Sequence, residues 1–474
     1  MYRLRGSDAQ TIYTETAISP FVTLKVMIYE PVSEDDVPTY TELKQFIKNG
    51  LKSWCDQGLS MRVVRVPFDL HHPVWFLDPN FNIDEHIHNV ALPKPGNSEK
   101  LCEFVSYILS MPMDQGRPLW DSWIVEGLEG GRIAWFCKVH HVHADGMMSA
   151  DQIVRIHQQD TGSAKEKLSA KVLVSSPGRV ALVTHAILDL IKSYTIELPR
   201  NIRVVKKARK SSIEKIEIDG NSTELPKAFG APYTCLNSPG GHYRRFDYHS
   251  VSLSKFKLIS KKYNCTINTL VLSVVSEVIR RYFIEIEEPV PTDPLVVVVP
   301  VAKQKIDNAK IFLNTEIHNN NLALAFVSLD LKIVSFCERL DSIRRSSEMA
   351  MAQVRHSDGR RIDSFSDYLP GILFTLLNKY ISYRQRKKRS LLANISISNV
   401  PGPKEQLLAC DGRLKMVDLL SCGNLMDINA MGVTVWSYVD NLCFNLLFRK
   451  GVLKKQYRIK EILSEVILEL EEGG

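Results

Sequence analysis

The chain has 474 residues, of which 45% are hydrophobic and 24% are charged, and its formal net charge is +7. This composition is ordinary for a soluble globular protein, and the length predicts two or three domains or two halves of one large α/β architecture. The net charge is too small for this length to indicate binding to nucleic acid.

Nine cysteines are scattered along the chain without a CxxC or zinc-ribbon spacing. This pattern predicts reduced thiols in a cytoplasmic protein. The first residues, MYRLRGSDAQTIYTETA, contain no apolar segment of the kind that a signal peptide needs. The longest apolar runs have the length of a strand, well short of the ~20 residues of a membrane-spanning helix. We therefore expect a protein that does not cross a membrane but is able to lie against one.

Residues 1–160 alternate strand-like and helix-like segments. Runs rich in β-branched residues predict strands, and apolar residues at helical spacing predict helices. In chain order, we expect a strand at Phe21–Pro31, helices at Tyr40–Trp54 and Leu101–Pro112, a strand at Gly131–His141 and a helix at Met148–Gln159.

Residues 161–240 differ in character from the segments on either side. A stretch rich in serine and lysine precedes an apolar-faced helix predicted at Val180–Tyr194. The segment Arg200–Lys210 follows, with six basic residues and no acidic one. The glycine, proline, asparagine and serine residues after it are typical of a connection. We interpret this part of the chain as a crossover linker.

Residues 241–474 return to alternating strands and helices. When a chain has two such halves joined by a long connector, the cleft between the halves is the first place to expect a ligand site. We expect a strand and two helices at Val251–Phe283 with a break at Thr266–Asn268, strands at Pro294–Ala302 and Leu391–Pro403, a hairpin at Ala430–Phe448 that turns at Asp440–Asn441, and a final amphipathic helix.

Three histidines lie within four positions of KVHHVHADG, at Lys138–Gly146, where a predicted strand meets a predicted helix. A neutral imidazole can accept a proton near pH 7 and pass it on. Asp145 lies four residues after His141, although Asp is also a favoured N-cap of a helix. Gly146 allows backbone angles and close approaches that a side chain would block. The loop is therefore the first candidate for a catalytic site.

Two other interpretations of this loop compete with catalysis. A zinc site would use His140, His141 and His143, but consecutive residues of a strand point to opposite faces, and tetrahedral zinc needs further ligands. We therefore expect no metal. The second interpretation is that the histidines are ordinary core residues, and we favour it for His140 and His143.

Several motifs resemble those of one family of acyltransferases. HHVHADG, at His140–Gly146, matches the HHxxxDG motif of the CoA-dependent acyltransferase superfamily. RPLW lies upstream at Arg117–Trp120, SNVPGP lies far downstream at Ser398–Pro403, and FNIDEHIHNVALPKPG occupies Phe81–Gly96. In this order and spacing, the motifs resemble the bifunctional wax ester synthase/acyl-CoA:diacylglycerol acyltransferase family over nearly the whole chain.

The resemblance implies an α/β fold with two chloramphenicol-acetyltransferase-like subdomains, whose mixed β-sheets are flanked by helices and whose interface forms an active-site tunnel. Residues 1–160 would form the N-terminal subdomain with the HHxxxDG loop, residues 161–240 the crossover linker, and residues 241–474 the C-terminal subdomain. The implied reaction moves a long-chain fatty acyl group from acyl-CoA to a fatty alcohol or to a diacylglycerol. No covalent acyl-enzyme and no cofactor are implied, because acyl-CoA is a co-substrate.

The resemblance also implies roles for individual residues. His141 is the implied general base, and Asp145 orients the loop. Asn268 is a candidate hydrogen-bond donor to the oxyanion, with a backbone N–H as an equal alternative. Pro118, Leu119 and Trp120 would line the cavity near the histidine, although ordinary core packing explains these residues equally well. The candidate catalytic residues are His141, His140 and Asp145, and the candidate substrate-binding residues are Gly146, Pro118, Leu119, Trp120 and Asn268.

Two positions depart from the pattern of the family. Asn268–Thr269 stands where the family has Asn-Asp, and Asn314–Phe326 lacks the glycine of a Gly-Asn pair. These departures leave the acceptor and the level of activity open. They also leave two alternatives: a condensation-type acyltransferase that uses an amine or a carrier-bound acceptor, and a non-catalytic lipid-binding protein on the same fold.

The implied substrates determine the expected partners. Each buried CH₂ of an acyl chain contributes ~0.8 kcal/mol, so a long tunnel favours long chains. We expect long-chain acyl-CoA, a fatty alcohol or diacylglycerol, and peripheral association with a membrane or lipid-droplet surface. The basic segments Arg200–Lys210 and Arg384–Arg389 are candidate contacts for anionic lipid, and the second also for the phosphates of CoA. A solvated basic surface explains each segment equally well.

Overall fold

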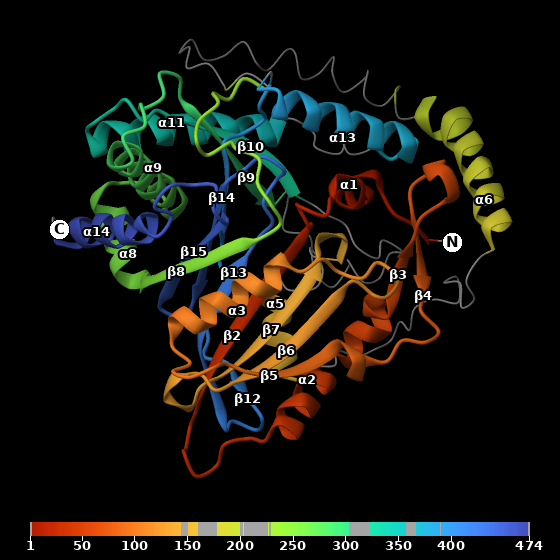
Figure 1. The fold of residues 1–474 in the computed structure, drawn as a ribbon, viewed down its shortest axis with the longest axis horizontal. Coiled ribbons are helices and arrows are strands. Elements are labelled where there is room, and N and C mark those ends of the chain that lie inside the picture. The colour runs from red at the N-terminus through yellow and green to blue at the C-terminus, as the bar shows by residue number, and fades with distance from the viewer. Residues whose placement is uncertain are drawn as a thin grey trace.

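Two six-stranded mixed sheets form the two halves of the molecule (Figure 1). The structure is a computed structural model, and it describes residues 2–143, 150–159, 178–199, 202, 226, 229–302, 322–356, 366–388 and 390–472. The mixed α/β architecture, with helices flanking the sheets, agrees with the fold class predicted from the sequence.

The first sheet has the strand order β12-β13-β2-β7-β6-β5. Neighbouring strands are antiparallel except β5 and β6, which are parallel. Every residue of β7 is buried, as expected for an inner strand whose sheet is covered on both faces. The strands are β2 (Val22–Pro31), β5 (Ile87–Ala91), β6 (Trp120–Glu126), β7 (Ile133–His140), β12 (Leu408–Ala409) and β13 (Leu414–Cys422).

Helices cover both faces of the first sheet. The helices α2 (Tyr40–Trp54) and α5 (Ala150–His157) pack on one face, and α3 (Ser98–Ser110) packs on the other. A capping box begins α2, because the Thr39 hydroxyl accepts the N–H of Glu42 while the Glu42 carboxylate accepts the N–H of Thr39.

The second sheet has the strand order β10-β9-β11-β14-β15-β8. β11 is parallel to both of its neighbours, and the other pairs are antiparallel. The helices α8 (Leu253–Lys262), α9 (Ile267–Glu285), α11 (Phe336–His356) and α14 (Arg458–Glu472) bury their apolar faces against it in one large core. The strands are β8 (Arg244–Ser252), β9 (Leu295–Ala302), β10 (Leu322–Leu329), β11 (Ile395–Val400), β14 (Met431–Tyr438) and β15 (Asn441–Arg449).

A small third sheet and three helices complete the described fold. The sheet has the order β1-β4-β3, with β1 at Tyr2–Arg3, β4 at Val74–Leu77 and β3 at Met61–Val64. The helices α1 (Gly6–Thr14), α6 (Arg179–Lys192) and α13 (Gly371–Arg386) lie towards the same edge of the molecule, at the upper right of Figure 1. No helix in the described part of the chain is long and apolar enough to cross a membrane.

The C-terminal half of the sequence completes the first sheet. β13 pairs with β2 along its length, from Leu414 opposite Pro31 to Cys422 opposite Leu24. The end of β14, with Trp436, also packs into the core of the first half. β12 and β13 therefore lie within the predicted C-terminal segment 241–474 but belong to the sheet built mainly by residues 22–140.

Most of the predicted elements recur in the structure. The hairpin predicted at Ala430–Phe448 is confirmed, since β14 and β15 pair antiparallel with Tyr438 opposite Asn441. The two helices predicted within Val251–Phe283 are α8 and α9, and the Thr266 hydroxyl caps α9. The helix predicted at Val180–Tyr194 is α6. The basic segment 200–210 lies outside the described residues except for residue 202, as does most of the linker.

Candidate active site

The histidine loop begins where β7 ends. His140 is the last residue of β7 and pairs with Val22 of β2, and residues 141–143 then turn into a helix. Asp145 and Gly146, which were predicted as a catalytic and a substrate-binding residue, lie outside the described residues. The geometry of the site therefore rests on His140, His141 and their neighbours.

His140 is fully buried, and its ring accepts one hydrogen bond and lies near one carboxylate. Its Nδ1 accepts the backbone N–H of Val142 at 3.0 Å, so the proton of a neutral ring resides on Nε2. Nε2 lies 3.5 Å from Oε2 of Glu15. The backbone N–H of His140 donates to the carbonyl of Leu119 at 3.0 Å, which ties the loop to the predicted PLW motif.

Glu15 follows the end of α1 and contacts three parts of the site. Its Oε1 accepts the N–H of Phe21 at 3.1 Å, and its Oε2 accepts from the side-chain amide of Gln115 at 2.9 Å. Burial on its own would raise the pKa of Glu15, but His140, Phe21 and Gln115 together lower it. The carboxylate is therefore ionised at neutral pH.

His141 is half-buried and is held through Phe21. Its backbone N–H donates to the carbonyl of Phe21 at 2.8 Å, and the two rings meet edge to face with their centres 5.3 Å apart. Burial lowers the pKa of His141 to about 4, and the nearby His140 and Lys25 act in the same direction. The imidazole is therefore neutral at pH 7 and able to accept a proton.

Lys25 is a buried amine on β2 that sequence reasoning missed. Its Nζ donates to the hydroxyl of Ser421 on β13 and lies 3.8 Å from the centre of the Trp436 ring. Burial lowers the pKa of Lys25 to about 7, although Cys422 and Cys137 act to raise it. The available signal was a single lysine within the otherwise apolar run VTLKVMIY.

The segment between Glu15 and Phe21 joins this site to the other half of the molecule. The Ile18 carbonyl accepts from the guanidinium groups of both Arg244 and Arg449, at 2.8 and 2.9 Å. The Ser19 hydroxyl donates to the carbonyl of Leu425. The histidine loop is therefore connected, through residues 15–21, to the place where the two halves meet.

The structure brings the PLW motif beside His140, but as part of the core. The Leu119 and Trp120 side chains are buried. The Trp120 indole stacks on the ring of His86 with centres 4.4 Å apart, and its N–H donates to the Leu59 carbonyl. Pro118 accepts the N–H of Trp120 at 2.9 Å. These contacts give the three residues packing roles next to the site, and their part in binding a substrate stays a prediction.

Asn268 belongs to an element of the other half of the molecule. It occupies the first turn of α9, in the second half of the molecule, and is half-buried. None of its interactions within the described part of the chain reaches His141. Its role as an oxyanion donor also stays a prediction.

The SNVPGP turn, in contrast, does reach the site. The N–H of Gly402 donates to the Ser437 hydroxyl at 3.1 Å, and a Cβ at this position would lie 1.8 Å from the Ser437 carbonyl oxygen and 3.4 Å from the ring of Trp436. Glycine is therefore required for the turn to pack against β14. The turn supports the tryptophan over which Lys25 lies.

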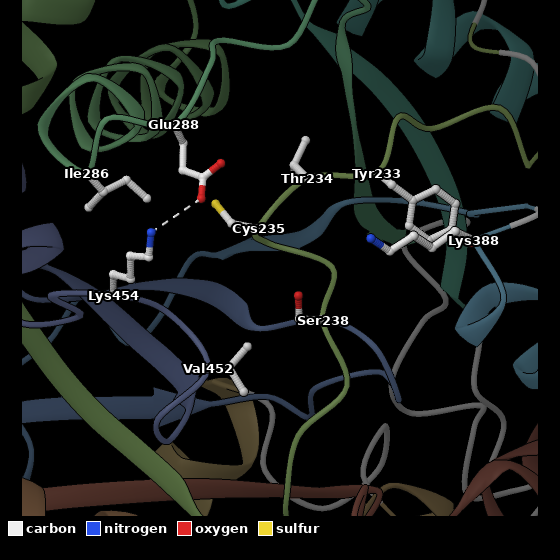
Figure 2. A pocket seen from close by; sticks show the side chains of 9 residues that line it. All are labelled: Tyr233, Thr234, Cys235, Ser238, Ile286, Glu288, Lys388, Val452 and Lys454. Carbon is white, nitrogen blue, oxygen red and sulfur yellow. Dashed lines mark ion pairs between the residues drawn. The ribbon is translucent and has the colours of Figure 1, made fainter.

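Figure 2 shows a pocket of about 400 Å³ that is separate from the histidine loop. All the side chains that line it come from residues 233–454, including the ion pair between Glu288 and Lys454 at 3.8 Å. Burial raises the pKa of Cys235 in this pocket to about 11, so its thiol is not a nucleophile at neutral pH. No cluster of three or more metal-binding side chains occurs among the residues that the structure describes.

Comparison with known protein families accounts for most of the chain. The model of the wax ester synthase/diacylglycerol acyltransferase catalytic domain matches residues 4–271, and that of the WS/DGAT C-terminal domain matches residues 318–471. The chain belongs to this family. The second match begins within residues 303–321, which the structure does not describe.

Individual relatives extend over nearly the full length of the chain. A Mycobacterium tuberculosis protein, provisionally named a diacylglycerol O-acyltransferase, is 28% identical over 94% of this chain and 92% of its own length. The O-acyltransferase WSD of Acinetobacter baylyi is 27% identical over 88% of both chains.

Solved structures share the fold. The wax ester synthase/diacylglycerol acyltransferase from Marinobacter aquaeolei superimposes with a TM-score of 0.65 over 99% of both chains, at 22% identity. A trichothecene 15-O-acetyltransferase from Fusarium sporotrichioides superimposes with a TM-score of 0.59 at 13% identity. The starter condensation domain of rhizomide synthetase superimposes with a TM-score of 0.54 at 10% identity. The predicted family and its acyltransferase fold are thus confirmed.

Proposed function

We propose that this WS/DGAT family member transfers a long-chain acyl group from acyl-CoA to the hydroxyl of a fatty alcohol or a diacylglycerol. The observation that carries the proposal is His141, which directly follows β7, is held by Phe21 through a backbone hydrogen bond and a ring contact, and has an imidazole that is neutral at pH 7. The names of the relatives from Acinetobacter and Mycobacterium support the same class of reaction.

In the proposed reaction, the unprotonated ring nitrogen of His141 takes the proton of the acceptor hydroxyl. The oxygen forms a bond to the thioester carbonyl carbon, and a tetrahedral oxyanion results. The carbon–sulfur bond then breaks, and the proton on His141 passes to the CoA thiolate, so the products are an ester and free CoA. No acyl-enzyme and no cofactor are needed. Asn268 or a backbone N–H is the proposed donor to the oxyanion, and Asp145 the proposed support of the loop.

We also propose that the protein works at a lipid surface, which it touches with α6 and α13. Half of the exposed large hydrophobic side chains in the described part of the chain lie on α6 and the turn after it, on α13, and at Phe68. The turn at Pro67–Asp69 contacts both helices and presents Phe68, which is 83% exposed, between them. An apolar surface of this extent is unusual for a protein that meets only water.

The charge on α13 favours an anionic lipid surface. The segment Gly371–Arg386 contains Lys379, Arg384 and Arg386 and no acidic residue. Tyr380 and Tyr383 lie on the same helix with exposed rings, and such amphipathic rings suit the boundary between water and lipid.

The transfer reaction is tested by incubating the purified protein with palmitoyl-CoA and one of three acceptors: hexadecanol, a diacylglycerol or a long-chain amine. Free thiol and lipid products are measured for the wild type, for His141→Ala, and for His88→Ala, which removes an imidazole of the same sheet outside the site. We expect ester from at least one hydroxyl acceptor and loss of that activity in His141→Ala only. Acylation of the amine alone would instead support a condensation-type enzyme. Folded protein that binds acyl-CoA and acylates no acceptor would support a lipid-binding protein.

The lipid surface is tested by sedimentation with vesicles of phosphatidylcholine alone or with phosphatidylglycerol. We expect binding that increases with the anionic lipid and that Leu376→Glu weakens at least tenfold. Leu258→Glu on α8, at a similarly exposed position away from α6 and α13, is the matched control and should bind as the wild type does. Equal binding of the wild type and Leu376→Glu would contradict the proposal that α13 is part of the lipid-binding surface.

A further inference from the structure

We propose that Glu15 is a positioning residue for His141. It acts through two neighbours, the buried His140 and the half-buried Phe21, and does not touch the substrate. The inference rests on the proposed function, because it assigns a support to the proposed base. Nothing in the motifs of the histidine loop points to Glu15, which lies more than a hundred residues earlier in the chain.

The first connection runs through His140. Its Nδ1 must stay unprotonated to accept the N–H of Val142, so its Nε2 must carry the proton. Nε2–H is fully buried and faces the carboxylate of Glu15 at 3.5 Å. The negative charge therefore favours the tautomer that closes the turn from which the His141 side chain projects.

The opposite tautomer would open this turn. With the proton on Nδ1, two N–H groups would face each other across the 3.0 Å that now separates His140 Nδ1 from the Val142 nitrogen. One of them would be left buried without an acceptor, which is unfavourable unless the turn moves. Residue 141 lies between these two groups, so its imidazole would move with the turn.

The second connection runs through Phe21. Glu15 accepts the N–H of Phe21, while the carbonyl of the same residue accepts the N–H of His141 and its ring lies against the imidazole. The chain between Glu15 and Phe21 is fixed in turn by Arg244 and Arg449, which both donate to Ile18. Glu15 therefore supports His141 in two ways. It acts through His140, the preceding residue, and through Phe21, the residue just before β2.

The substitution Glu15→Gln separates this role from simple packing. It keeps the size of the side chain and one acceptor oxygen, which is sufficient for Phe21. The negative charge that faces Nε2–H of His140 is lost, and the amide NH₂ that replaces one carboxylate oxygen would face either Nε2–H of His140 or the amide of Gln115. A control of the same kind is Asp121→Asn, because Asp121 also pairs with a histidine of the first sheet, His88 at 3.0 Å, without a contact to His141.

The test uses the full-length protein with ¹⁵N-labelled histidine, and the His140 signals are assigned with His140→Gln. We expect wild-type His140 to be the Nε2–H tautomer and Glu15→Gln to show a second form with the proton on Nδ1. With palmitoyl-CoA and the preferred acceptor, we expect kcat to fall at least tenfold in Glu15→Gln. KM should stay within about twofold, and Asp121→Asn should leave both the tautomer and kcat unchanged.

The outcomes separate this inference from the proposed function. An unchanged His140 tautomer in Glu15→Gln, or an unchanged kcat in an active wild type, would overturn the positioning role. An inactive wild type whose His140 tautomer still depends on Glu15 would refute the acyl transfer reaction but support the contact network. A rise in KM at constant kcat would place Glu15 in substrate binding and would also overturn the proposal.

Discussion

At His141, burial would have two opposite effects on the proposed catalysis. It lowers the pKa of the imidazole to about 4, which keeps the ring neutral and able to accept a proton. It also makes the ring a weaker base than a histidine in water, so the proposed reaction would depend on how precisely the ring is held against the acceptor. The contacts that hold the ring come from Phe21.

The first prediction concerns the pH dependence of the reaction. His141 must be neutral to act, and its pKa is lowered, so it becomes inactive only when the pH falls below that pKa. We expect kcat/KM to be constant from about pH 5 to 7 and to fall by half near pH 4. The measurement is kcat/KM with a soluble acyl-CoA between pH 3.5 and 8. An acidic limb centred near 6.5, the ordinary value for histidine, would show that the ring is solvated.

The second prediction concerns the stability contributed by Lys25. Its folded pKa of about 7 lies below the value of about 10.4 for a lysine in an unfolded chain. Between these values the unfolded state binds one proton more, so the free energy of unfolding rises with pH by up to about 1.4 kcal/mol per unit. We expect Lys25→Met to be more stable than the wild type at pH 7, with a difference that shrinks towards pH 10.

Urea unfolding at several pH values measures this difference. The control is Lys415→Met, which changes a lysine on β13 whose side chain is half exposed. A Lys25→Met protein that is less stable than the wild type at pH 7 would contradict the prediction. It would mean that the contacts with Ser421 and Trp436 outweigh the burial of the charge.

The sequence motif singled out His141 but neither Glu15 nor Lys25, for a physical reason. His141 belongs to a dense local motif, whereas Glu15 acquires its partners only when the end of α1 meets His140 in the folded chain. Lys25 occurs in a run of apolar residues, and periodicity places its side chain on a buried face without revealing what it meets there. Long-range contacts give both residues their environment.

At the scale of elements, the SNVPGP turn packs against β14 and contacts Trp436, over whose ring Lys25 lies. Gly402 allows the turn to approach β14 so closely that the Ser437 carbonyl would overlap a Cβ. The local signal of the sequence predicted a turn after the strand, and the structure adds what it touches. The hairpin at β14 and β15 was also predictable, since both strands and the turn lie within one short segment.

The third prediction follows from this close contact. We expect Gly402→Ala to destabilise the protein by roughly 1–3 kcal/mol, because the turn must move away from β14. The midpoint of urea unfolding measures the change. Gly241→Ala is the matched control, since a Cβ at Gly241 meets no atom within 4 Å. Equal stability of the two variants would show that the turn adjusts freely.

At the scale of the whole molecule, the two halves are interlocked. β12 and β13 belong by sequence to the second half but complete the first sheet, and Trp436 packs into the core of the first half. The predicted subdomain boundaries could not show this, because the pairing of β2 with β13 leaves no local pattern in either strand. The family resemblance predicted the two-sheet fold.

The fourth prediction concerns fragments of the chain. We expect residues 1–240 expressed alone to be insoluble or molten, because β2 then lacks its partner strand. Co-expression with residues 241–474 should restore soluble protein that contains both fragments. Size-exclusion chromatography and near-UV circular dichroism measure the outcome. A soluble fragment 1–240 with a cooperative unfolding transition would contradict the prediction.

The pairing of β2 with β13 also has a consequence during protein synthesis. A ribosome adds about 5–20 residues per second, so β2 emerges tens of seconds before the strand that covers its edge. Through that interval the nascent chain carries an open, apolar strand edge, to which another nascent chain can pair. The yield of native protein should therefore depend on chaperones that bind nascent chains, and on the speed at which codons downstream of β2 are translated.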